Sequence, residues 1–230
     1  MTGRCLALIR ERPRLIVSLP QNEPELALAA MDGGADALKV HLNVTHEASG
    51  TRFGTLDEER DRLEAILAIG LPVGIVPGVT GSLPSRSEMD KLARMGVDFF
   101  DLYDHDMPAW MTNFESMTRT IAASDRTPLS AIAQLERLGF EMLEGAIIPH
   151  EGYGLPLSVA DLMNYQRLRT ATNLPIIVPT QRAIEPDDLP SLLRIGIDAL
   201  MIGAIVTGRT PDSLRRATSE FAEALSASAA

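Results

Sequence analysis

The stretch LPIIVPTQRAIEPDDLPSLLRIGIDALMIGAIVTG, residues 174–208, contains the pattern that decides the fold. Residues 174–179 form a short apolar run, which is typical of a strand buried on both faces. Residues 185–196 predict a helix, because acidic residues occupy the first turn and a glycine stands at the end. Residues 197–208 predict a second buried strand that runs into two glycines. The stretch is therefore a strand–helix–strand unit.

This unit ends in a glycine turn that leads into another helix. Thr210 is a candidate N-cap residue, and Pro211 suits the first helical position. A glycine turn at a helix N-terminus favours phosphate binding, because free backbone N–H groups and the helix dipole both attract an anion. We therefore predict an anion site around Gly203 and Gly208.

The rest of the chain predicts six further strands, each followed by a helical segment. Residues 45–54 are expected to form a long polar loop, and residues 107–116 a short helix. Eight strands that alternate with helices are the signature of a (β/α)8 TIM barrel. The six strands, two of them given with the loops that follow, cover residues 14–20, 35–44, 71–78, 97–106, 117–124 and 140–154.

The length of 230 residues fits one such barrel, so we expect a single domain over residues 1–230. Residues 1–13 are expected to form an N-terminal extension with a short helix. Residues 225–230, at the C-terminal end, are expected to fray.

The composition argues against several classes of protein. A net charge of −10 argues against nucleic acid and anionic membranes as partners, but a small anionic ligand responds only to the local field. The single cysteine, Cys5, excludes an internal disulfide and favours a reducing cytoplasm. No apolar run approaches the roughly 20 residues that span a bilayer. We expect a cytoplasmic protein, with a homodimer as a candidate assembly.

Four of the predicted strands share a local pattern, in which a glycine is followed by an apolar residue and an acid. They are the even-numbered strands GGADALKVH, MGVDFFDLY, LGFEMLEGA and IGIDALMIG. When these strands are aligned, one set of alternate residues faces the helices and the other set faces the barrel axis. Alternate strands of a TIM barrel contribute side chains to the same interior layer. The axial layers, ending at the C-terminal mouth, are Ala37, Phe99, Met142 and Ala199; Lys39, Asp101, Glu144 and Met201; and His41, Tyr103, Ala146 and Gly203.

Lys39, Asp101 and Glu144 are the strongest candidates for catalysis. Charges inside a barrel are costly unless they are paired. A partly desolvated lysine beside carboxylates can be tuned toward proton transfer near neutral pH. The alternative is a buried ion pair that only closes the barrel centre. A Schiff base on Lys39 is less favoured, since two carboxylates stabilise the ammonium over the free amine.

The histidines all fall at or just after the C-terminal ends of the even strands. His41 and His150 are candidates to bind or protonate a substrate, whereas His46 and His105 fit a solvated loop equally well. A divalent metal held by histidine and carboxylate is the alternative. No HxH or HExxH spacing occurs, so we assign no metal ligands. The acids beside these histidines are Glu47, Asp104, Asp106 and Glu151.

Further polar residues near the mouth are candidates for substrate or phosphate binding. Thr180 and Gln181 follow strand seven and can hydrogen-bond a substrate. Arg182 can make a bidentate contact with phosphate, or it is an ordinary exposed arginine. Tyr103 belongs to the predicted mouth layer.

The pattern resembles the ribulose-phosphate-binding barrels, which include sugar-phosphate epimerases, decarboxylases, thiamine-phosphate synthase and enzymes of tryptophan synthesis. Locally, IDALMIGAIVTGRTPDSLRRATSEF (197–221) is similar to the strand-eight and final-helix segment of N-acetylmannosamine-6-phosphate epimerases. That resemblance implies that Gly203, Ala204 and the following turn hold a phosphate. The chain departs from the group after strand seven, where PTQRAIEP replaces the usual glycine-rich turn, and LPVGIVPG lacks the decarboxylases' D-x-K-x-x-D.

Together these observations predict an enzyme for a small anionic, phosphorylated and sugar-like metabolite of carbohydrate metabolism. The favoured reaction is proton abstraction beside a carbonyl, as in an isomerase or epimerase, with carbon–carbon lyase chemistry next. Lys39 would act as the acid–base residue with the two carboxylates as partners. No organic cofactor is predicted. The alternatives are a divalent-metal-dependent lyase or hydrolase, and a non-catalytic ligand-binding barrel.

Overall fold

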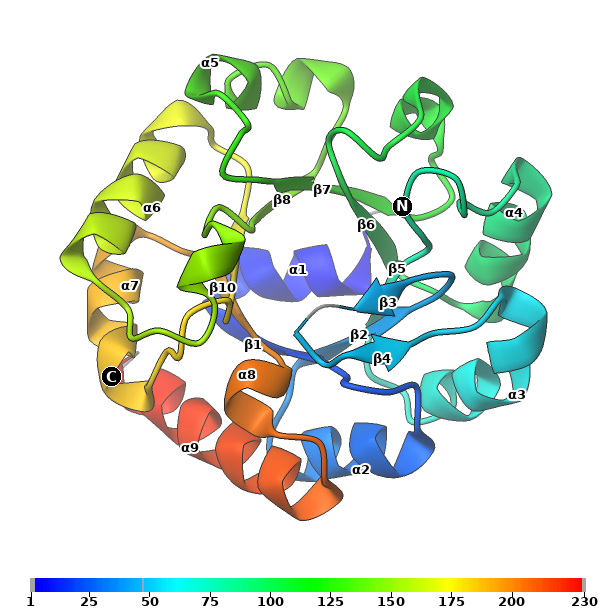
Figure 1. The fold of residues 1–230 in the computed structure, drawn as a ribbon, viewed down its shortest axis with the longest axis horizontal. Helices are drawn as coiled ribbons and strands as arrows, with labels where there is room; N and C mark the ends of the chain where they lie inside the picture. The colour runs from blue at the N-terminus through cyan, green and yellow to red at the C-terminus, as the bar shows by residue number, and fades with distance from the viewer. Residues whose placement is uncertain (1–2, 47, 229–230) are drawn as a thin grey trace.

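The computed structural model, which describes residues 3–46 and 48–228, confirms the (β/α)8 barrel. Within those ranges, eight parallel strands close in the order β1-β10-β9-β8-β7-β6-β5-β2, with helices arranged around them (Figure 1). The strands are β1 (Arg14–Ser18), β2 (Ala37–His41), β5 (Val73–Val76), β6 (Phe99–Tyr103), β7 (Thr118–Ala123), β8 (Met142–Gly145), β9 (Ile176–Pro179) and β10 (Ala199–Ile202).

The α-helices that begin at residues 56, 86 and 159 start at capping residues that the sequence supplies. Thr55, Ser85 and Ser158 each form a reciprocal capping box with the acid three residues later. None of the helices in the described ranges has the length and apolar character needed to cross a bilayer. The helical segments are α1 (Arg4–Glu11), α2 (Pro24–Asp32), α3 (Leu56–Leu67), α4 (Arg86–Met95), η1 (Ala109–Asn113), α5 (Leu129–Ile132), η2 (Glu136–Leu138), η3 (His150–Gly152), α6 (Val159–Ala171), η4 (Pro186–Asp188), α7 (Leu189–Ile195), α8 (Ala204–Thr207) and α9 (Pro211–Ser228).

Four local expectations differ from the structure. The long polar loop contains an antiparallel hairpin, β3 (Thr45–His46) with β4 (Thr51–Arg52). The helix expected after β7 is divided into α5 and η2. The last strand ends at Ile202, because Gly203 caps the short helix α8. The tail does not fray from residue 225, since α9 continues to Ser228 and buries Leu225 against the core.

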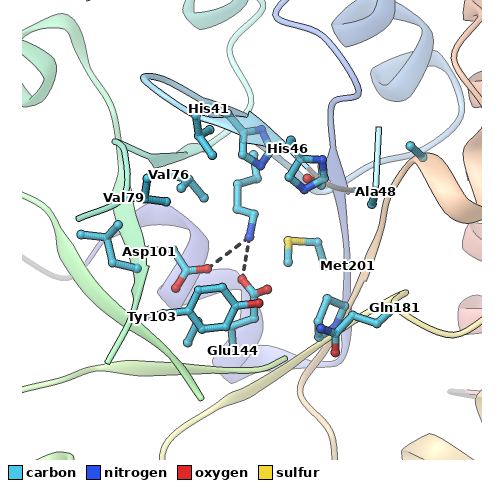
Figure 2. Close-up of a pocket in the computed structure, with 18 of the residues that line it drawn as sticks. His41, His46, Ala48, Val76, Val79, Asp101, Tyr103, Glu144, Gln181 and Met201 are labelled. Carbon is cyan, nitrogen blue, oxygen red and sulfur yellow. Dashed lines mark hydrogen bonds and ion pairs between the residues drawn. The ribbon is translucent and has the colours of Figure 1, made fainter. Parts of the chain in front are cut away.

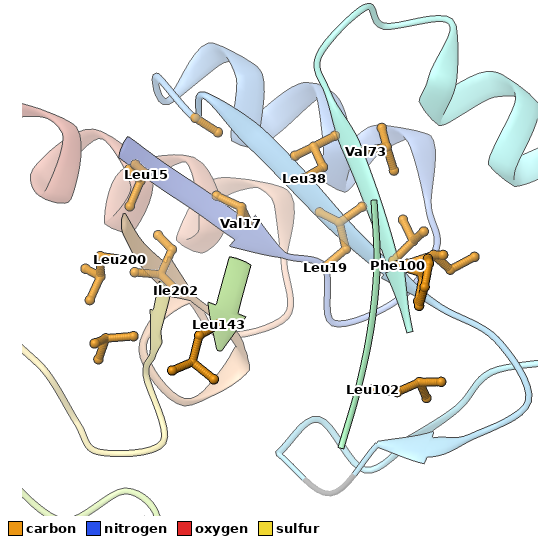
Figure 3. Packing of buried hydrophobic residues seen from close by; sticks show 14 of the residues in the cluster. Leu15, Val17, Leu19, Leu38, Val73, Phe100, Leu102, Leu143, Leu200 and Ile202 are labelled. Carbon is orange, nitrogen blue, oxygen red and sulfur yellow. The ribbon is translucent and has the colours of Figure 1, made fainter. Parts of the chain in front are cut away.

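The main apolar core lies between the strands and the helices, as the outward set of residues predicts. Leu38, Phe100, Leu143 and Leu200 occupy matching positions on the even strands, and all are fully buried. Figure 3 shows these side chains together with Leu15 and other residues of the same core. Each buried leucine or phenylalanine contributes roughly 1.5–3 kcal/mol, so this outer layer fixes which faces of the strands remain for the interior.

The N-terminal helix α1 covers the end of the barrel opposite the mouth, where Figure 1 shows it across the barrel axis. Cys5, Leu6 and Ile9 pack against the lowest interior layer, which includes Ala37 and Phe99. Burial raises the pKa of the Cys5 thiol far above its ordinary value, so this cysteine stays a neutral apolar residue. The N-terminal extension therefore closes the barrel at that end.

The acid repeated at the start of the even strands is explained by backbone pairing. Asp36, Glu141 and Asp198 each accept the N–H of a residue at the start of the preceding strand, at 2.8–3.1 Å. Each also pairs with an arginine. The fourth acid, Asp98, instead accepts the N–H groups of Arg4 and Cys5 and so holds the start of α1. The repeat is therefore a structural device of the barrel's closed end.

Replacing Gly74 with alanine is expected to lower the free energy of unfolding by roughly 1–3 kcal/mol, because overpacking strains a filled core. A Cβ atom at Gly74 would overlap the ring of Phe99 inside the barrel. Gly203→Ala is the matched control, since its Cβ would meet Ser18 at an ordinary 3.7 Å. Urea unfolding measures both variants. Equal stability of the two would contradict the interior packing described here.

Candidate functional site

A cavity of about 350 Å³ opens at the C-terminal ends of the barrel strands (Figure 2). Barrel active sites lie on this face, because the strand ends and the loops after them converge there. Its charged floor is formed by β2, β6 and β8. Aliphatic side chains, among them Val44, Val76, Val79 and Ile205, form much of the wall.

The floor of the cavity is a buried ammonium held between two carboxylates. Lys39 Nζ lies 3.2 Å from Asp101 Oδ2 and 2.6 Å from Glu144 Oε2, the two contacts drawn as dashed lines in Figure 2. The three side chains are only 2–9% exposed. The structure thus brings together the three charges that the layer alignment placed in one row, beside Met201.

Burial and mutual charge decide how this cluster holds its protons. Burial and the neighbouring Asp101 raise the pKa of Glu144 well above its ordinary value. Burial lowers the pKa of Lys39, but Glu144 and Asp101 outweigh it, so the net shift is upward. Asp101 Oδ1 is buried and accepts no hydrogen bond from the described residues. The cluster therefore keeps its ammonium and favours a protonated Glu144.

His41 continues from the same strand as Lys39 into the wall of the cavity. Its ring is 1% exposed and lies 4.5 Å from the His46 ring and 4.8 Å from the Phe53 ring, centroid to centroid. Burial, with His46 and Lys39 nearby, lowers the pKa of His41 well below its ordinary value, so the ring is neutral. Its Nδ1 is buried without a hydrogen-bond partner among the described residues.

The predicted anion site contains two available backbone N–H groups. Gly203 N–H donates to Thr180 Oγ1 at 2.9 Å, which fixes the end of β10 against β9. Val206 and Thr207 donate to the Gly203 carbonyl. The first-turn N–H groups of Ala204 and Ile205 have no acceptor in the described part of the chain, and both residues line the cavity. Their N–H groups, rather than that of Gly203, are the available donors.

Gln181 and Tyr103 also line the cavity, as expected from their positions after β9 and in the mouth layer. Gln181 Nε2 donates to Tyr153 Oη at 2.6 Å, and Gln181 Oε1 accepts the N–H of Ile148 at 3.1 Å. Burial raises the pKa of the Tyr103 hydroxyl, so this group is a neutral hydrogen-bonding residue. Thr180 and Gln181 therefore shape the wall through bonds to the protein.

Three predicted site residues lie outside the cavity wall. Gly208 N–H donates to the Ala204 carbonyl at the end of α8 and is not available to a ligand. Arg182 contacts Asp161 at 2.9 Å, because the first turn of α6 presents that carboxylate to it, and it also donates to the Gly152 carbonyl. His150 is exposed on η3, where its ring lies 5.1 Å from the ring of Tyr153, and Tyr153 rather than His150 lines the cavity.

The sequence interpretation left His46 open between a solvated loop residue and a site residue. The β3–β4 hairpin places it in the cavity beside His41. The four paired residues of this hairpin are too few to produce a recognisable strand pattern, so no local signal could have located it. Ser18 lines the cavity as well, from the end of β1.

The histidines and acids near the mouth do not assemble into a metal-binding group in the described ranges. No set of three or more His, Cys, Asp or Glu side chains there has suitable proximity. His105 lies on the loop after β6, where it contacts Asp104 at 3.1 Å. Glu47, named with the histidines from the sequence, lies outside the described residues.

Comparison with known proteins shows the fold. No family model matches the chain, and no curated protein sequence matches it. Thiamine phosphate pyrophosphorylase from Pyrococcus furiosus is 16% identical, with 97% of this chain and 100% of that chain covered and a TM-score of 0.69. Tryptophan synthase from Mycobacterium tuberculosis is 14% identical, with 98% and 99% covered and a TM-score of 0.76.

A third structure, the tryptophan synthase A-subunit from Pyrococcus furiosus, is 15% identical, with 91% and 98% covered and a TM-score of 0.73. These matches support the (β/α)8 barrel fold. At such identities the likeness concerns the fold and leaves the reaction to the residues of the cavity.

Proposed function

We propose that this protein is an enzyme that removes a proton from carbon beside a carbonyl group in a small anionic metabolite. The observation that carries the proposal is the buried Lys39–Asp101–Glu144 cluster at the floor of a cavity on the catalytic face of a barrel. Apolar side chains could fill the same interior at little cost, so three buried charges there indicate a role beyond packing. Isomerisation or epimerisation is the simplest such reaction, and carbon–carbon cleavage is the next.

The three side chains can divide acid–base chemistry between them. We assign the substrate proton to Asp101, which lines the cavity and whose Oδ1 accepts no hydrogen bond from the described residues. Glu144, whose pKa is raised, is placed to return a proton to the substrate. The Lys39 ammonium bridges both carboxylates and stabilises negative charge that develops on the substrate oxygen. A Schiff base is disfavoured, since the same carboxylates hold the proton on Lys39.

The anionic end of the ligand is assigned to the turn after β10. Ala204 and Ile205 offer two backbone N–H groups at the rim of the cavity. Two backbone donors suit a phosphate or carboxylate oxygen. The name of one structural neighbour, thiamine phosphate pyrophosphorylase, supports a phosphorylated ligand. The local sequence similarity to N-acetylmannosamine-6-phosphate epimerases implies a phosphate at this same turn. The aliphatic wall favours a ligand with fewer hydroxyl groups than a free sugar carries.

A ligand screen followed by solvent exchange tests this function. Anionic carbonyl metabolites are ranked by thermal shift, because a ligand present at 100 times its Kd stabilises the native state by about 2.7 kcal/mol. Each hit is then incubated with the protein in D2O, and loss of its C–H signal is followed by NMR. We expect exchange at the carbon beside the carbonyl, and at least about 100-fold slower exchange with Asp101→Asn. Binding without exchange in the wild-type protein would contradict the proposal.

A further inference from the structure

The β3–β4 hairpin brings a second imidazole to the wall of the cavity. Thr45 pairs with Arg52, and His46 pairs with Thr51, so the hairpin holds His46 at a defined position. Its ring lines the cavity and tilts against the ring of His41 at 4.5 Å, and both are labelled in Figure 2. A residue from a loop after β2 thus joins the residues of the strand itself.

The hydrogen bonds of this hairpin determine which ring nitrogen of His46 carries the proton. The backbone N–H of Ser49 lies 3.3 Å from His46 Nδ1 and is directed at it. A backbone N–H can only donate, so Nδ1 must be the unprotonated nitrogen. Ser49 Oγ also lies 3.2 Å from Nδ1 and accepts the N–H of Thr51. The hydroxyl proton of Ser49 is therefore free to be donated to Nδ1. In a neutral ring, the proton must then be on Nε2.

The ring is neutral because of its surroundings. Burial, with the Lys39 ammonium nearby, lowers the pKa of His46 to about 4. Nε2 makes no hydrogen bond with any residue in the described ranges, and it is not among the buried atoms that lack a partner. The Nε2–H group is therefore an unused donor on a ring that faces a cavity.

We propose that His46 is a substrate-contacting residue, which donates a hydrogen bond from neutral Nε2–H to the carbonyl oxygen of the substrate. This inference rests on the proposed function. When Asp101 takes the proton from carbon, the C–H electron pair forms the new carbon–carbon double bond, and the carbonyl electron pair moves onto oxygen. The His46 hydrogen bond stabilises the resulting enolate oxygen without transferring its proton. A neutral imidazole serves this purpose because the pKa of its N–H group is closer to the pKa of an enol than the pKa of an imidazolium is.

Two substitutions separate this role from simple packing. The side-chain amide of glutamine can place its nitrogen near the position of Nε2, whereas the shorter asparagine amide reaches only the position of Nδ1. We expect His46→Gln to retain deuterium exchange within about 5-fold of wild type, and His46→Asn to lose about 100-fold or more. Thermal unfolding is the control, and both variants should keep the wild-type midpoint.

The tautomer is measured without any ligand. Nitrogen NMR of protein labelled with 15N-histidine should show one ring, absent from His46→Gln, as the neutral Nε2–H form at pH 7. An Nδ1–H tautomer, a charged ring at pH 7, or equal exchange in the glutamine and asparagine variants would overturn the inference. A wild-type protein that shows the expected tautomer but exchanges no bound carbonyl compound would refute the proposed function instead.

Discussion

Replacing Lys39 with methionine is expected to slow proton exchange by about 10²–10⁴-fold and to lower the free energy of unfolding by about 3–5 kcal/mol. Among the residues that the structure describes, the Lys39 ammonium is the hydrogen-bond donor to Asp101 Oδ2 and Glu144 Oε2. Without it, two buried carboxylates face each other, and a charge that has lost its partner inside a protein is strongly destabilising. Exchange by NMR and unfolding in urea measure the two effects.

The loss of stability in this variant should depend on pH. Glu144 has a pKa raised above its unfolded value, so the folded state binds more protons than the unfolded state between those two values. Stability therefore falls as pH rises from about 4.5 through the raised pKa. Lys39 lowers the pKa of Glu144 in the wild-type protein. Removing Lys39 therefore raises that pKa further and widens the pH range over which the folded state binds more protons. The deficit should be small at pH 5 and largest at pH 8.

Lys91→Met provides a matched control, since Lys91 is exposed on α4. It should change both exchange and stability by little at either pH. A Lys39→Met protein with wild-type exchange would show that the ammonium has no part in the chemistry. A deficit that does not vary with pH would contradict the assigned protonation of Glu144.

Replacing the whole cluster should separate chemistry from stability. The triple variant Lys39→Met, Asp101→Val, Glu144→Met removes all three buried charges and keeps side chains of broadly similar volume. Apolar replacements of buried ion pairs are often neutral or stabilising by about 1–4 kcal/mol. We therefore expect a stability equal to or above wild type, together with exchange at the level of the Lys39→Met protein. The neighbouring interior residues Phe99, Met142 and Met201 are already apolar.

The comparison of the single and triple variants decides between the two interpretations of the cluster. If the charges serve the reaction, stability recovers in the triple variant while exchange remains lost. A triple variant that unfolds as easily as Lys39→Met would show that the charges hold the barrel together. In that case the buried cluster would no longer support the proposed chemistry, because its presence would be explained by folding alone.

Most of the barrel could be predicted from local patterns. The apolar runs, the capping residues at 55, 85 and 158, and the glycines after helices mark elements one at a time. The alternation of residues on the even strands then placed Lys39, Asp101 and Glu144 in one layer, since alternate strands of a barrel contribute side chains to the same interior layer. Each of these inferences uses neighbours within one element or one repeated unit.

Other features depended on contacts between segments that are distant in sequence. Arg182 is occupied by Asp161, and Gly208 uses its N–H to end α8, so neither reaches the cavity. The division of the helix after β7 into α5 and η2 has no evident cause in its sequence.

The sequence by itself determined the barrel and the charged layer across its interior, because both follow from periodicities of two and 3.6 residues that repeat along the chain. Only the tertiary structure decided which polar groups remain available to a ligand. The stretch 174–208 shows the difference, since its glycine turn is where the sequence predicts, yet Thr180 occupies the Gly203 N–H and leaves those of Ala204 and Ile205. The N–H groups that a ligand can use are those left without a partner after the long-range hydrogen bonds have formed. Those bonds depend on the folded arrangement of all the strands.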